Sequence, residues 1–141
     1  MKNKLRNFFY YRYLKYFKKY IKLNSKPYIS GDTFRSFSDH VYDELKKMDS
    51  KKVKKNDIVF VKTDFINEFL ENDLDNINDF FILITHNSDL EINKTQLEKL
   101  DDKNLVWFAQ NLSLLHSIEK RVKPLPIGLE NRSYFKNGKL K

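Results

Sequence analysis

The chain of 141 residues contains no cysteine and only three glycines and three prolines. Without cysteine, neither a disulfide framework nor a cysteine-ligated zinc site can form, which fits a cytosolic protein. Glycine-based motifs are also missing, because no GxGxxG, GxxxxGK[ST] or GxSxG sequence occurs. A dinucleotide-binding fingerprint, a P-loop and a nucleophile elbow are therefore excluded.

Long apolar runs are missing as well. Lysines interrupt every apolar stretch of residues 1–26, so this segment is neither a secretory signal nor a membrane span. The segment holds nine Lys or Arg side chains, no acidic side chain and eight aromatic side chains. The other 115 residues carry 18 basic and 19 acidic groups, so the net charge of +8 belongs to the first 26 residues.

Apolar side chains in the basic segment recur at spacings of three and four, at Leu5, Phe9, Tyr13, Tyr16 and Tyr20. The spacing predicts an amphipathic helix over residues 1–26. Basic and aromatic side chains on one helix suit an anionic membrane surface, and would make the protein peripheral on a membrane. The alternative is a helix that packs its aromatic side on the domain. Nucleic acid is disfavoured as a partner, because the rest of the chain is close to neutral.

Short apolar runs alternate with helical patterns from Pro27 onward. Strands are predicted at 27–30, 58–62, 80–85, 105–110 and 122–129, and helices at 31–48, 64–72 and 95–102, with residues 111–121 forming a turn or short helix. Asp32 and Asp64 are placed to cap two of these helices, and Thr95 with Glu98 has the spacing of a capping box.

This alternation predicts a single Rossmann-like α/β domain over residues 27–141, with a mostly parallel sheet of about five strands and helices on both faces. The apolar strands are nearly continuous, which is typical of strands buried on both faces. The side chains expected in the core include Phe60, Ile82, Leu83, Val106 and Phe108.

Polar side chains follow each predicted strand. Because parallel strands end at the same edge of a sheet, these residues are expected to converge on one pocket. The stretch 85–89 is longer than a helix cap needs. The substrate-binding candidates are Gly31, Asp32, Lys62, Thr85, Asn87, Ser88, Gln110, Asn111, His116 and Asn131.

His86 and Asp89 are the candidates for catalysis. Imidazole titrates near neutral pH, so His86 could take a proton from a substrate hydroxyl while the nearby carboxylate of Asp89 orients the ring. The alternative for His86 is a hydrogen-bonded histidine that only fixes its loop. The alternative for Asp32 and Asp64 is that each only caps a helix.

Five motifs occur in a recognisable order: PYISGDTFR, DIVFVKTD, ILITHNSD, VWFAQN followed by His116, and PLPIGLEN. Together they resemble the amino-terminal half of exostosin-like glycosyltransferases of bacteria and large viruses. The resemblance covers residues 27–131. It implies a GT-B-like enzyme that transfers a sugar from a nucleotide sugar to a glycan acceptor without a tightly bound metal or other cofactor.

In such enzymes the amino-terminal domain mainly holds the acceptor, and the carboxyl-terminal domain binds the nucleotide sugar. This sequence ends ten residues after Asn131, where a donor-binding domain would be expected to begin. The expectation is therefore half of an enzyme that is completed by a missing carboxyl-terminal domain or by a partner chain. The alternative is a non-catalytic α/β module that binds a glycan or a membrane surface.

Overall fold

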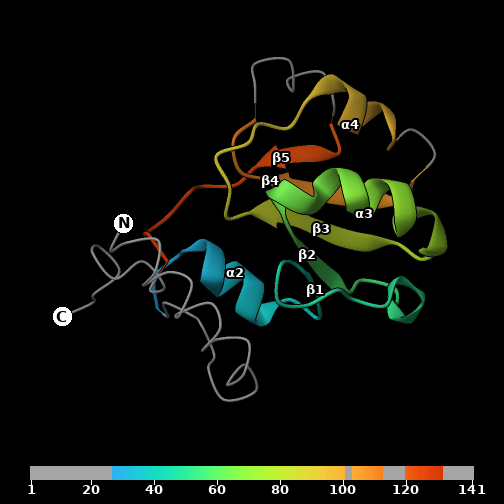
Figure 1. The fold of residues 1–141 in the computed structure, drawn as a ribbon, viewed down its shortest axis with the longest axis horizontal. Coiled ribbons are helices and arrows are strands. Elements are labelled where there is room, and N and C mark those ends of the chain that lie inside the picture. The colour runs from blue at the N-terminus through green and yellow to red at the C-terminus, as the bar shows by residue number, and fades with distance from the viewer. Residues whose placement is uncertain (1–26, 101–102, 113–119, 132–141) are drawn as a thin grey trace, which may run out of the picture.

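The computed structural model describes residues 27–100, 103–112 and 120–131, so the predicted basic helix of residues 1–26 and His116 lie outside it. The described chain forms a five-stranded parallel sheet with the strand order β1-β2-β3-β4-β5. The strands are β1 His40–Tyr42, β2 Ile58–Lys62, β3 Phe81–His86, β4 Leu105–Ala109 and β5 Val122–Pro124. The predicted Rossmann-like α/β fold with a parallel sheet is confirmed (Figure 1).

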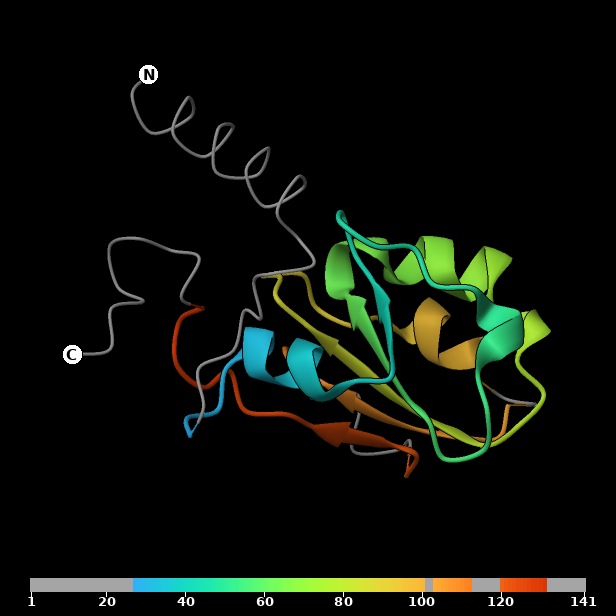
Figure 2. The ribbon, with the colours of Figure 1, turned by 90° about the horizontal axis from the view of Figure 1, so that it is seen from below.

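Three α-helices accompany the strands: α2 Gly31–Phe37, α3 Ile66–Asn72 and α4 Lys94–Glu98. Short 3₁₀ turns lie at Ser50–Lys52, Thr63–Phe65 and Leu74–Asn76. The strands follow one another across the sheet without a reversal, so right-handed crossovers place α3 and α4 on the same face. Helix α2 precedes β1 and packs on the opposite face (Figure 2). No helix of the described part is long and apolar enough to cross a membrane.

Two apolar clusters hold the layers together. On the α3 face, Phe69 packs against strand residues such as Leu83 and Trp107, all of them completely buried. On the α2 face, a smaller cluster joins Phe34 of the helix to Phe60 and neighbouring strand residues. The second face has fewer covering side chains. Of the five predicted core residues, Phe60 and Leu83 are fully buried, whereas Ile82, Val106 and Phe108 are half-buried. Phe60 is fully buried although it lies in the smaller cluster.

The prediction of a helix over 31–48 is wrong beyond Phe37. Ser38 has extended backbone angles, and residues 40–42 form β1 beside β2. The backbone N–H of Asp39 donates to the carbonyl oxygen of Ile58, and the Asp39 carboxylate accepts the backbone N–H of Ile58. Pairing with β2 therefore outweighs the helical spacing of the apolar side chains.

Residues 27–30 were predicted to be the first strand of the sheet, and this assignment is also wrong. Ser30 forms only an isolated parallel bridge with Leu129, and the backbone N–H of Leu129 donates to the carbonyl of Ile29 at 2.8 Å. The sheet has the expected number of strands because β1 takes the place of this segment. The bridge instead brings residues 28–30 beside residues 127–131.

The predicted caps also differ from the observed ones. Ser30 caps α2, with its hydroxyl oxygen accepting the N–H of Thr33 at 3.1 Å, so Asp32 is not the cap. Helix α3 begins two residues after Asp64 and has no side-chain cap. The capping box of α4 is formed by Asn93 and Gln96 rather than by the predicted pair Thr95 and Glu98.

Asp43, directly after β1, ties α2 to the sheet. Its buried carboxylate accepts the Arg35 Nε–H at 2.5 Å and the backbone N–H groups of Leu45 and Lys46, each at 2.8 Å. Arg35 lies in the last turn of α2. The position of the helix start, where the pocket begins, therefore depends on this carboxylate.

Replacing Asp43 with Ala is expected to lower the free energy of unfolding by about 2 to 4 kcal/mol. The reason is that a largely buried guanidinium and two backbone N–H groups lose their acceptor. Urea unfolding followed by circular dichroism measures the change. Lys46→Ala, an exposed substitution in the same turn, is the matched control and should change stability by less than about 0.5 kcal/mol. Equal effects of the two substitutions would contradict the anchoring role.

Candidate functional site

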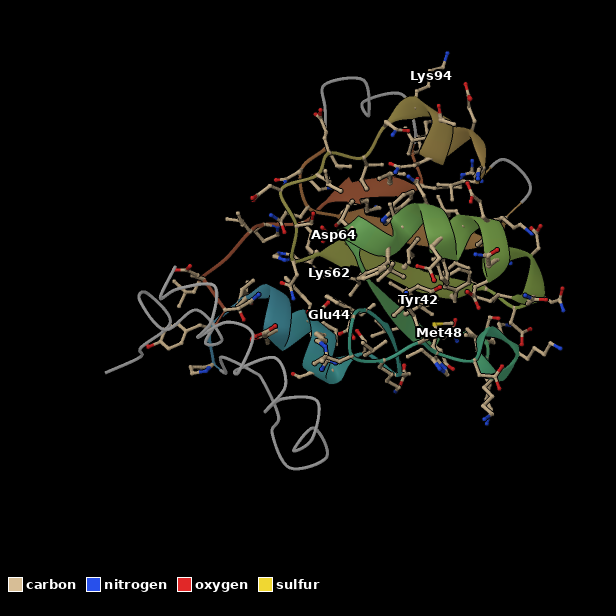
Figure 3. All side chains as sticks on the ribbon, in the orientation of Figure 1. Tyr42, Glu44, Met48, Lys62, Asp64 and Lys94 are labelled. Atoms are coloured by element: carbon tan, nitrogen blue, oxygen red, sulfur yellow. The ribbon has the colours of Figure 1, made fainter. Side chains whose placement is uncertain are left out.

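A pocket with a volume of about 720 Å³ opens at the carboxyl-terminal edge of the sheet. Its walls come from the loops that follow β2, β3 and β4, from the start of α2 and from the segment 127–131. The lining residues are Gly31, Lys62, Asp64, His86, Asn87, Ser88, Asp89, Leu90, Gln110, Ile127, Gly128, Leu129, Glu130 and Asn131. Figure 3 labels Lys62 and Asp64, which lie next to each other at the end of β2.

Strand register explains why residues distant in sequence meet here. Lys62 at the end of β2 pairs with His86 at the end of β3, and Gln110 follows the last residue of β4. The backbone N–H of Gln110 donates to the carbonyl of Thr85 at 3.1 Å. The residues that follow the parallel strands therefore lie at one edge of the sheet, as the sequence predicted.

Three residues form a closed hydrogen-bonded cycle beside the pocket, which we call the amide ring: Asp32, Asn87 and Asn131. Asn87 Nδ2 donates to Asp32 Oδ1 at 3.2 Å, and Asn131 Nδ2 donates to Asn87 Oδ1 at 2.8 Å. The backbone N–H of Asp32 donates to Asn131 Oδ1 at 2.7 Å, which closes the cycle. Residues from α2, the β3 end and the final segment are thereby fixed to one another.

Asn87 can make these contacts because its backbone is left-handed, with φ of 65°. Asparagine adopts this conformation more readily than other residues with a side chain, apart from aspartate. Gly31 permits the close approach of the two segments. A Cβ at Gly31 would lie 1.6 Å from Asn87 Oδ1 and 2.5 Å from His86 Nδ1, so any larger residue must displace the ring.

The imidazole of His86 is buried, and both of its nitrogens contact the main chain. Nε2 lies 3.3 Å from the carbonyl oxygen of Pro126, and Nδ1 lies 3.3 Å from Asn87 Oδ1, so each ring nitrogen has an acceptor nearby. The backbone N–H of Asn87 also points at Nδ1, which favours the neutral tautomer with its proton on Nε2. Nδ1 then accepts the backbone N–H of Asn87 at 2.8 Å. Burial lowers the pKa of His86, which agrees with this neutral form. The geometry supports a positioning role for His86, and Asp89 is not its hydrogen-bond partner.

Other polar groups of the pocket are free to meet a ligand. Asp89 and Glu130 have exposed carboxylates that contact no donor in the described chain. Gln110 is largely buried at the pocket wall, where its Oε1 accepts the backbone N–H of Asn87 at 3.2 Å and its Nε2 has no partner among the described residues. The pocket therefore offers an amide donor and two carboxylate acceptors.

The remaining candidates occupy different places. Ser88 lines the pocket, and its Oγ accepts the N–H of Leu90. Lys62 also lines it, with its ammonium 3.4 Å from Asp64 Oδ2 and 3.5 Å from Glu44 Oε2.

Three predicted residues of the described chain lie outside the lining: Asp32, which belongs to the amide ring beside the pocket, and Thr85 and Asn111. Thr85 is fully buried beneath the pocket, where its hydroxyl accepts the Trp107 Nε1–H at 2.8 Å. Asn111 shapes the loop after β4 through its left-handed backbone and a bond from its Nδ2 to the Ser88 carbonyl.

Several lining residues were not among the predicted site residues. Asp64 and Glu130 follow strands in the sequence, and the rule of strand ends includes them, although they were not chosen as site candidates. Leu90, Ile127 and Leu129 are apolar, and a search for polar residues after strands could not find them. Among the described residues, no three His, Cys, Asp or Glu side chains lie close enough to hold a metal ion.

Asp32 is the most unusual group of the amide ring. It is 5% exposed, and its Oδ2 is the one buried side-chain oxygen or nitrogen of the described chain without a hydrogen-bond partner. Burial raises the pKa of Asp32 to about 6, against the opposing effects of the Asn87 hydrogen bond and the Arg35 charge. Ionised Asp32 therefore lowers the free energy of unfolding at neutral pH. Destabilising ionised groups of this kind are common among functional residues.

No protein-family model, curated protein or solved structure matches this chain. Its function has to be inferred from the chemistry of the pocket.

Asp32→Asn is expected to stabilise the protein at pH 8 and to change little at pH 4. Between these values the folded state holds a proton on Asp32 that the unfolded chain has released, so wild-type stability falls as the pH rises through the window from about 4 to 6. Asp32→Asn does not lose stability in this pH window, so its free energy of unfolding at pH 8 should exceed that of wild type by about 1 to 3 kcal/mol. Urea unfolding of both proteins at the two pH values measures the difference. A variant that is less stable than wild type at pH 8 would show that the charged carboxylate is structural.

Proposed function

We propose that the pocket binds a neutral carbohydrate and that the chain is the acceptor-binding part of a glycosyltransferase. The observation that carries the proposal is the set of unpartnered polar groups in the pocket, an amide donor on Gln110 and carboxylates on Asp89 and Glu130. Neighbouring hydroxyls of a sugar both donate and accept hydrogen bonds. Carboxylates accept from such hydroxyls while an amide N–H donates to them.

The charge of the pocket favours an acceptor sugar over a nucleotide sugar. Among its lining residues, the three carboxylates of Asp64, Asp89 and Glu130 face one ammonium, that of Lys62, which already lies near two carboxylates. A pyrophosphate would meet repulsion from these groups, since phosphate sites in proteins use cationic side chains or backbone N–H groups. A neutral glycan would not.

The amide ring supports the proposal through rigidity. A pocket wall that is fixed before the ligand arrives loses less conformational entropy on binding. Asn87 and Asn131 hold each other in one orientation, and Gln110 is fixed through the backbone of Asn87. The donor and acceptor positions are therefore set in advance.

Asp89 is the group best placed to take a proton during transfer. Its carboxylate is exposed in the pocket and has no competing donor among the described residues. When an acceptor hydroxyl attacks the anomeric carbon of a donor sugar, the bond to the leaving nucleotide breaks and the hydroxyl proton passes to a base. His86 would support this step by holding the 86–87 turn, since its own nitrogens are engaged with the main chain. The resemblance to exostosin-like enzymes is the reason for proposing transfer rather than binding alone.

The test measures the binding of a panel of neutral mono- and disaccharides by saturation-transfer NMR. Uridine diphosphate is the charged comparison. At least one neutral saccharide is expected to bind, and uridine diphosphate is not expected to compete with it. Asp89→Asn should weaken binding by about 10-fold to 100-fold, because a hydrogen bond to a charged group is lost.

Glu91→Gln is the matched control, since Glu91 is an exposed acid in the same loop that does not line the pocket. It should leave affinity unchanged. The proposal would be contradicted by uridine diphosphate binding in the pocket while no saccharide binds, or by equal losses in the two variants.

A further inference from the structure

Exposed apolar side chains gather at the mouth of the pocket. The large apolar residues that are exposed in the described chain are Tyr28, Ile29, Phe37, Leu90, Ile127 and Leu129. Three of them, Leu90, Ile127 and Leu129, line the pocket. Ile29 lies beside them, because its carbonyl accepts the Leu129 N–H, and Tyr28 precedes it. We call these five residues, without Phe37, the apolar rim.

The rim is held in place by backbone contacts, so its exposure is built into the fold. Gly128 has a φ of 69°, and a Cβ there would lie 2.4 Å from the carbonyl oxygen of Ile29. The two rim segments thus touch through their main chains and turn their side chains outward. Ile127 is 62% exposed and Leu90 is 54% exposed. Exposed apolar side chains that gather around one pocket indicate a contact with another apolar phase or molecule.

The sequence next to the rim indicates what covers it. Residues 1–26, which carry nine basic and no acidic side chains, are joined in the sequence through Pro27 to Tyr28 of the rim. The rest of the chain is nearly neutral, so the excess positive charge of the sequence belongs to the segment that is joined to the rim. Basic and aromatic residues beside exposed apolar side chains match an anionic lipid surface, where charges meet headgroups and apolar groups enter the interface.

We propose that the apolar rim lies in the headgroup region of an anionic membrane and that the glycan bound in the pocket is carried on a lipid. This inference rests on the proposed function, because it names the class of acceptor for the same pocket. The sugar would contact Asp89 and Gln110 inside the pocket. Its lipid would pass between Leu90, Ile127 and Leu129 into the bilayer.

Vesicle co-sedimentation tests the surface. Full-length protein is mixed with vesicles of phosphatidylcholine and phosphatidylglycerol, and the double variant Ile127→Ser/Leu129→Ser is compared with Phe37→Ser. Both changes replace exposed apolar side chains, but Phe37 lies at the far end of α2, away from the pocket. The rim variant should bind at least about tenfold more weakly than wild type, and the control should bind like wild type. Equal binding of the two variants would overturn the inference.

A second measurement tests the class of acceptor separately from carbohydrate binding. The affinities of n-octyl β-D-glucoside below its micelle concentration and of methyl β-D-glucoside are compared by NMR. The octyl compound should bind at least about tenfold more tightly to wild type, and the rim variant should lose this difference. Equal affinities for both compounds would overturn the lipid-linked acceptor and leave carbohydrate binding intact. Failure of the whole saccharide panel, in contrast, would remove the proposed function itself.

Discussion

The contacts of Asn87 determine the shape of the pocket. Its backbone N–H binds His86 Nδ1 and Gln110 Oε1, and its side chain joins Asp32 to Asn131. Four segments that are far apart in the sequence therefore meet at one residue with a left-handed backbone. The arrangement is possible only because Gly31 has no Cβ where the Asn87 amide lies. Displacing this side chain would release the β3 end, the α2 start and the final segment from one another.

One side chain beside the pocket, that of Asp32, lowers the stability of the fold when it is ionised. Asp32, the second residue of α2, is buried with one carboxylate oxygen unpartnered, and the cap of the helix is Ser30. Polar groups buried without partners are rare in folded proteins and need a reason. Here the carboxylate orients Asn87, and Asn87 in turn sets the orientation of the groups that face the pocket. Positioning a rigid binding wall is a physical reason for keeping a costly charge.

The sequence predicted the strands and the shared edge well, because β2, β3 and β4 are runs of branched and aromatic residues whose ends are polar. It failed at β1, where three residues fall within a helical spacing and only pairing with β2 makes them a strand. It also assigned His86 to proton transfer, since sequence cannot show that Pro126 and Asn87 engage both ring nitrogens. The apolar rim was missed because Ile29 and Leu129 become neighbours only through a long-range bridge.

We propose that a sugar binds among the polar groups at the carboxyl-terminal edge of the sheet. Intermolecular nuclear Overhauser effects between a bound saccharide and the isotope-labelled protein test it most directly. Contacts are expected from sugar ring protons to the side-chain amide protons of Gln110 and to the backbone amides of Ser88 and Asp89. Contacts confined to another surface, such as the exposed face of α3 or α4, would contradict it.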